Sequence, residues 1–152
     1  MTATDPIDLT TRHGRRTAQR LRTEEVVWLT TVDPSGMPQP TPVWFLWRPG
    51  APGEPGIGDV LLVSRPGTAK LRNVRQRPGV ALHFGTDARG DDVVVLLGRA
   101  RVEGEERLDA DRRAEFDAKY ATAMGRLGMT PEGFHDDYRV LVRVVPERLR
   151  GW

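Results

Sequence analysis

The sequence contains no cysteine, and this absence excludes several kinds of chemistry at once. Without thiols the chain forms no disulfide, has no thiolate nucleophile and offers no cysteine ligand to zinc or to an iron–sulfur cluster. Its three histidines, His13, His83 and His135, lie far apart and match no metal-binding spacing such as HxH or HExxH. We therefore expect no dedicated metal site.

Long apolar runs are also missing. No segment approaches the roughly 18–20 apolar residues of a membrane span, and the polar start Met1–Asp8 lacks the apolar centre of a signal peptide. With 152 residues, of which 38% are hydrophobic and 29% charged, the composition is typical of one soluble globular domain. We expect a single cytoplasmic domain over residues 1–152, no membrane partner, and a flexible N-terminal tail over residues 1–11.

Lysine is scarce, because only Lys70 and Lys119 among the 23 basic residues are lysines. Such an arginine-rich composition is typical of a high-GC genome. The net charge is only +2, acids interleave with bases over most of the chain, and no nucleic-acid-binding motif is present, so we expect no nucleic-acid partner. The segment Arg65–Arg77 is different, because it carries five basic residues and no acidic one.

Hydrophobic patterning and turn residues predict a mainly β domain with inserted helices. Val26–Val32 and Gln39–Trp47, joined by the turn Asp33-Pro34-Ser35-Gly36, are typical of a β-hairpin. Six strands are predicted in all, the other four over Asp59–Ser64, Val80–Thr86, Val93–Glu103 and Arg139–Val145. Helices are predicted over Arg12–Glu25, Thr68–Gln76 and Asp109–Leu127, with a short helical turn within Thr130–Tyr138, a loop over Arg48–Gly58 and a tail over Pro146–Trp152.

Consecutive strands joined by tight turns favour an antiparallel barrel over a doubly wound parallel sheet. No GxGxxG fingerprint follows a strand, which argues against a Rossmann domain. Pro38, Pro40 and Pro42 alternate along the second strand. Because proline has no N–H to donate, this strand must lie at a sheet edge or face a ligand.

A candidate anion site follows the strand Asp59–Ser64. Arg65 and Lys70 flank the predicted N-terminus of the next helix, where the helix dipole disfavours cations. A bound anion such as phosphate would reverse that cost, because N–H groups, the Ser64 and Thr68 hydroxyls and both cations could converge on it. The alternative interpretation is an ordinary helix capped by Thr68, with Lys70 in solvent.

The aromatic-rich strand Thr41–Trp47 can supply an apolar wall for a planar ring, although such residues are also typical of a core. No Ser-His-Asp order and no GxSxG elbow is present. His83 is best interpreted as a core or interface residue, and the acidic pairs as solvated turns. We therefore assign no catalytic side chain.

Together these segments resemble a known family. The hairpin LTTVDPSGMPQPTPVWF, the strand and helix LLVSRPGTAKLRNVRQRPGVALHF, a long strand with a glycine and the tail PERLRGW are similar to the flavin and deazaflavin oxidoreductase B group of the pyridoxamine 5'-phosphate oxidase-like superfamily. The Thr-x-Lys-x-x-Asn run resembles the family's cofactor-phosphate motif. The resemblance covers residues 24–84 most closely, 93–102 and 139–152 more loosely, and 109–127 only by position.

The resemblance implies an antiparallel split β-barrel of the FMN-binding type, assembled as a homodimer with cofactor sites at the subunit interface. It assigns the phosphate-bearing part of the cofactor to Ser64, Arg65, Thr68, Lys70 and Asn73. It assigns the ring to Thr41, Pro42, Val43 and Trp44. Arg72 and Arg75, three residues apart on one helical face, could extend the basic surface away from the phosphate.

The expected cofactor is the deazaflavin coenzyme F420, with flavin mononucleotide (FMN) as the alternative. FMN oxidases of the superfamily carry an arginine and a lysine on the third strand, where this chain has Leu61-Leu62-Val63. The B group in actinobacteria usually binds coenzyme F420. The expected function is hydride transfer between coenzyme F420 and an unidentified small organic substrate. The alternatives are a carrier or binding protein for coenzyme F420, flavin or haem, and an FMN-dependent oxidase-like enzyme.

Overall fold

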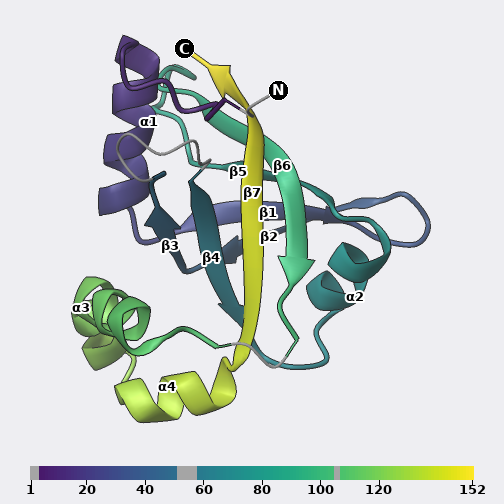
Figure 1. Ribbon diagram of the computed structural model, residues 1–152, viewed down its shortest axis with the longest axis vertical. Helices are drawn as coiled ribbons and strands as arrows, with labels where there is room; N and C mark the ends of the chain where they lie inside the picture. The colour runs from purple at the N-terminus through teal and green to yellow at the C-terminus, as the bar shows by residue number, and fades with distance from the viewer. Residues whose placement is uncertain (1–3, 51–57, 105–106) are drawn as a thin grey trace.

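The computed structural model describes residues 4–50, 58–104 and 107–152. Figure 1 shows strands curled around one another, with α1 along one side, α2 on the other, and α3 and α4 together at one end. In chain order the elements are α1 (Arg12–Thr23), β1 (Val27–Val32), β2 (Pro38–Val43), β3 (Phe45–Arg48), β4 (Asp59–Ser64), α2 (Ala69–Gln76), β5 (Gly79–His83), β6 (Val94–Val102), α3 (Ala110–Arg126), α4 (Pro131–Asp137) and β7 (Val140–Gly151).

The described strands form one antiparallel sheet in the order β2-β1-β5-β6-β7-β4-β3. β2 and β3 are its two edges, yet a single residue, Trp44, separates them in the chain. In a flat sheet of this size the edges would lie about 29 Å apart, which one residue cannot span. The sheet must therefore curl until its edges approach, and the predicted split β-barrel is confirmed.

The sequence also predicted the edge position of the proline-rich strand. β2 pairs only with β1 among the described strands, and Pro38, Pro40 and Pro42 lie opposite Val32, Thr30 and Trp28. The hairpin turn and strand Asp59–Ser64 are likewise confirmed. The free edge thus carries the residues that lack an N–H.

Two strand predictions are wrong. The predicted strand Gln39–Trp47 is two strands, because the chain leaves one edge of the barrel at Val43 and joins the other at Phe45, which makes seven described strands rather than six. The predicted tail from Pro146 is instead the second half of β7, which pairs with β6. The pairing tolerates Pro146 at a register shift beside Gly98, where an added Cβ would lie 2.3 Å from the Val145 carbonyl oxygen.

Helix boundaries differ from prediction by a few residues. α3 ends at Arg126, so Leu127, predicted as the last helical residue, is a C-cap residue that is 57% exposed. Thr68 occupies the N-cap position of α2 as predicted, but its side chain caps no helix N–H. Ile7, within the predicted tail, is buried in the main core.

The protein has two apolar clusters. The larger fills the barrel, where alternate residues of the strands meet α1 through Leu21 and α2 through Leu71 and Val74. The second lies outside the barrel, where α3 and α4 cover one face of β3, β4 and β7. Its buried members are Leu46, Leu61, Phe116, Tyr120, Ala123, Met124, Phe134 and Leu141. The outer cluster therefore fixes two helices beside the split.

Tyr120 connects the outer cluster to the split. Its side chain is fully buried, and its hydroxyl accepts a hydrogen bond from the Phe45 N–H at 2.8 Å. The same hydroxyl donates to the Glu25 carbonyl oxygen at 2.7 Å and also lies 3.0 Å from the Phe45 carbonyl oxygen. Burial raises the pKa of Tyr120, so the hydroxyl stays protonated.

We expect Tyr120→Phe to lower the free energy of unfolding by about 1–3 kcal/mol, because the buried Phe45 N–H loses its partner. Urea denaturation measures this change. Tyr138→Phe is the matched control, since no described residue hydrogen-bonds the half-buried Tyr138 hydroxyl. Equal unfolding midpoints for Tyr120→Phe and the wild type would show that Tyr120 does not hold the split.

Candidate cofactor site beside the split

A pocket of about 320 Å³ lies beside the split. Pro42 and Val43 line it from the end of β2, and Trp44 lines it from the junction between β2 and β3. Val63 of β4 and Lys70 of the first turn of α2 complete this side. The α3–α4 region adds Leu127, Met129, Phe134 and Tyr138. Of the predicted residues, the structure therefore brings three of the ring wall (Pro42, Val43 and Trp44) and one of the anion site (Lys70) into one cavity.

Trp44 forms a rigid part of the wall. Its indole stacks on the ring of Tyr120, with centroids 4.4 Å apart and planes 7° apart. It also stacks on Phe134 at 5.2 Å. Aromatic pairs of this geometry add stability beyond their buried area. The wall is therefore held in place before any ligand binds.

Lys70 is the cation of the pocket. Its side chain is half-buried, and among the described residues none hydrogen-bonds or ion-pairs with its ammonium group. Burial lowers the pKa of Lys70, since desolvation penalises the charged form. The N-terminus of α2 has no side-chain cap. A bound anion would relieve the cost of the buried charge and also meet the positive end of the helix.

Ser64, Thr68 and Asn73 have partners within the protein and do not line the pocket. The Ser64 hydroxyl donates to the Arg65 carbonyl oxygen at 2.9 Å and lies 3.1 Å from the Thr68 hydroxyl. Asn73 is buried and donates to the Thr31 hydroxyl of β1 at 3.0 Å. These bonds fix the turn and α2, and so position Lys70.

The other predicted site residues lie around the pocket rather than in its wall. Arg65 is exposed, lies 5.1 Å from the ring centre of Tyr138 and makes a long ion pair with Asp137 at 3.6 Å. Arg72 is exposed on α2 and donates to the Gly67 carbonyl oxygen at 2.8 Å. Thr41 is half-buried on β2 and is not among the lining residues.

Sequence reasoning missed the third wall of the pocket. Phe134 and Tyr138 stack with ring centroids 4.6 Å apart, and Met129 precedes them in the connection from α3 to α4. Phe134 and Tyr138 are four residues apart, and such a pair shares one helical face. This spacing could have indicated an aromatic wall in the sequence.

The histidines lie outside this pocket. His83 stacks on Trp28 at 6.3 Å on the outer surface of the barrel, and His135 is buried against Asp117 at 2.6 Å. Over residues 4–50, 58–104 and 107–152, no three potential metal ligands gather. Nor is any helix in these ranges long and apolar enough to cross a membrane.

The family profile described as pyridoxamine 5'-phosphate oxidase matches residues 15–152 of the chain. The chain belongs to this family. No curated protein matches the sequence.

Solved structures share the fold at low sequence identity. An F420 reductase is 20% identical in sequence and superposes with a TM-score of 0.57. The match covers 87% of this chain and 94% of the reductase chain. HutZ, the haem storage protein of Vibrio cholerae, is 17% identical, with a TM-score of 0.60 and coverages of 89% and 92%. A conserved hypothetical protein from Mycobacterium tuberculosis is 17% identical, with a TM-score of 0.61 and coverages of 100% and 89%. At these identities the likeness shows the fold alone.

Proposed function

We propose that this protein is an oxidoreductase that transfers a hydride between the deazaflavin coenzyme F420 and a small organic substrate. The observation that carries the proposal is the juxtaposition of Lys70, without a partner among the described residues, and the aromatic wall at Trp44. A coenzyme with a planar ring and a phosphate needs both. About 320 Å³ is at the lower end of the range for ligand pockets, so the anionic tail would extend outside.

The chain's own residues bind and orient the coenzyme. Lys70 and the N-terminus of α2 hold the phosphate, while Pro42, Val43 and Trp44 support one face of the ring. The bound coenzyme supplies the hydride chemistry. Leu127 and Met129 add apolar side chains to the pocket lining, which would help to exclude water from it.

The family includes proteins with other roles, and a haem or flavin carrier is the second candidate. It is supported by the fold shared with the haem storage protein HutZ. No histidine is among the residues that line the pocket, which disfavours haem ligation by this chain's own imidazoles there. Leu61 and Leu62 of β4 are buried and Val63 lines the pocket, so β4 adds no cation for FMN.

Catalytic turnover of reduced coenzyme F420 distinguishes the proposed oxidoreductase from a carrier protein. Reduced coenzyme F420 is mixed with the protein and with quinones, unsaturated lactones or tetrapyrroles, and its oxidation is followed by absorbance. We expect consumption above background with at least one class of acceptor. Tight binding without consumption across the panel would favour the carrier.

Lys70→Ala should weaken coenzyme F420 binding roughly ten- to hundredfold, because a charge-assisted hydrogen bond contributes about 1.5–3 kcal/mol. Fluorescence titration measures the dissociation constant. Arg89→Ala is the matched control, since it removes an exposed cation from the turn between β5 and β6. An affinity for Lys70→Ala within about twofold of the wild type would refute the phosphate assignment.

Coenzyme F420 should bind more tightly than FMN, because its glutamate tail adds negative charge beyond the phosphate. Arg72 and Arg75 are both exposed on α2, next to Lys70. We expect the affinity for coenzyme F420 to rise with tail length and to fall with salt, since the Debye length is about 8 Å at physiological ionic strength. Titrations at two salt concentrations test this. Tighter binding of FMN at both would assign the site to flavin instead.

We also propose that the protein is a homodimer. The outward side chains of β1 and β5 leave an apolar face, on which Trp28 is 38% exposed and stacks on His83. A hollow of about 370 Å³ lies on the same strands. Trp28 faces Pro42 across the hairpin, and Pro42 also lines the cofactor pocket. A second copy on this face would therefore border the pocket, as the family resemblance implies.

Light scattering should give about twice the 17.0 kDa mass of the chain. Trp28→Glu should shift the protein towards monomer, because it places a charge within the apolar face. Leu9→Glu, at a 51% exposed leucine before α1, should leave the mass unchanged. A wild-type monomer at all micromolar concentrations would contradict the proposed interface.

A further inference from the structure

A smaller cavity of about 50 Å³ adjoins the cofactor pocket. Val63 and Tyr138 line both, so the two cavities share a wall. The smaller one is completed by Leu108, Leu141, His135 and three arginines, Arg107, Arg113 and Arg139. A water molecule occupies about 30 Å³ in the liquid, so the space suits a small polar group and is too small for an aromatic ring.

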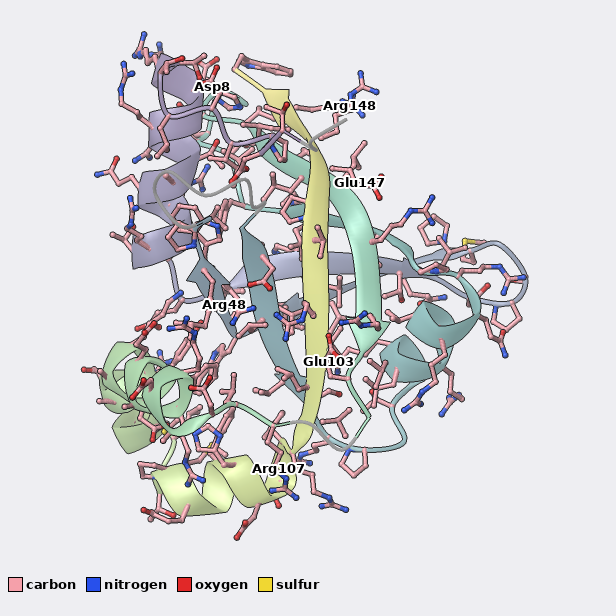
Figure 2. The ribbon with its side chains drawn as sticks, in the orientation of Figure 1. Asp8, Arg48, Glu103, Arg107, Glu147 and Arg148 are labelled. Atoms are coloured by element: carbon pink, nitrogen blue, oxygen red, sulfur yellow. The ribbon has the colours of Figure 1, made fainter. Side chains whose placement is uncertain are left out.

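Arg107 and Arg139 are exposed, and Arg113 is half-buried. Among the described residues none of them ion-pairs with a carboxylate, and Arg139 donates only to the Asp136 carbonyl oxygen at 3.2 Å. Figure 2 shows Arg107 where α4 leads into β7. Glu105 and Glu106, which precede Arg107, lie outside the described residues, so Arg113 and Arg139 are the two arginines to which the anion site is assigned.

Arginines in the neighbouring part of the sheet behave differently. Arg48 donates to both carboxylate oxygens of Asp59, and Arg143 bridges Asp59 and Glu103. Figure 2 shows Arg48 and Glu103 on this face of the barrel. Arg113 and Arg139 have no such carboxylate partner among the described residues, so an anion in the small cavity would supply their counter-charge.

His135 contributes an oriented ring to the same cavity. Its side chain is 8% exposed, and Nε2 lies 2.6 Å from Oδ1 of Asp117. A carboxylate can only accept, so Nε2 carries a proton. Asp117 lies one helical turn after Arg113, and its bond to His135 leaves Arg113 free for another anion.

We propose that Arg113 and Arg139, with Arg107, form a second anion site that binds the carboxylate or phosphate group of the substrate. The substrate would then be a small anionic molecule, anchored beyond the Val63–Tyr138 wall with its remainder against the coenzyme ring. The substrate assignment rests on the proposed function. The anion site itself rests only on the arginines.

The first test uses the coenzyme-free protein and inorganic phosphate as the probe. Nε–Hε signals of Arg113 and Arg139 in ¹H–¹⁵N spectra should shift saturably, in the wild type and in Lys70→Ala alike. Arg89 provides the control signal. Shifts that do not saturate, or that match those of Arg89, would overturn the proposal.

The second test uses Arg113→Gln/Arg139→Gln in the Lys70→Ala background. Phosphate affinity should fall by about tenfold or more, as expected when charge-assisted hydrogen bonds are lost. The charge-retaining variant Arg113→Lys/Arg139→Lys should keep part of the affinity, which separates loss of a ligand site from loss of the fold. Equal phosphate affinity in the Gln variant and its parent would refute the site.

A third arm identifies the source of the anion. Arg113→Gln/Arg139→Gln, with Lys70 intact, is titrated with short-tailed and long-tailed coenzyme F420. We expect wild-type affinity for both forms. A loss confined to the long-tailed form would show that the coenzyme tail occupies the cavity, and would overturn the substrate assignment. Saturable phosphate binding without any coenzyme binding would leave the anion site standing and refute the proposed function.

Discussion

Trp44 alone joins the two opposite edges of the sheet. One residue spans less than 4 Å, so β2 and β3 must be brought together by curling the whole sheet. The Tyr120 hydroxyl bonds the backbone at Phe45 and Glu25 at this junction. The same geometry places Trp44 in the gap between the edges, where its indole is available to a ligand.

Closure of the barrel also explains why the site has three walls. The interior of the barrel is filled by its own side chains, which leaves no space for a cofactor there. α3 and α4 pack on the outside and contribute Phe134 and Tyr138. α2 begins directly after β4, which brings Lys70 to the same place. The pocket is therefore a surface feature produced by the split and lined by segments far apart in sequence.

Local chemistry could be predicted from the sequence, and long-range placement only in part. The Asp33-Pro34-Ser35-Gly36 turn, the edge prolines and the strand Asp59–Ser64 follow from residue types that act over a few positions. The break between β2 and β3 at Trp44 and the extension of β7 past Pro146 could not be predicted in this way. Both depend on pairing with strands that are distant in the sequence. Within the site, Lys70 and Trp44 were predicted, whereas Ser64 and Asn73 have partners inside the protein that no local pattern reveals.

A crystal structure of the protein with coenzyme F420 would test the proposed cofactor site most directly. We expect the deazaflavin ring to lie against Pro42, Val43 and Trp44, with a phosphate oxygen within hydrogen-bonding distance of Lys70 Nζ. A coenzyme bound elsewhere, or a phosphate group remote from Lys70 and the start of α2, would contradict it.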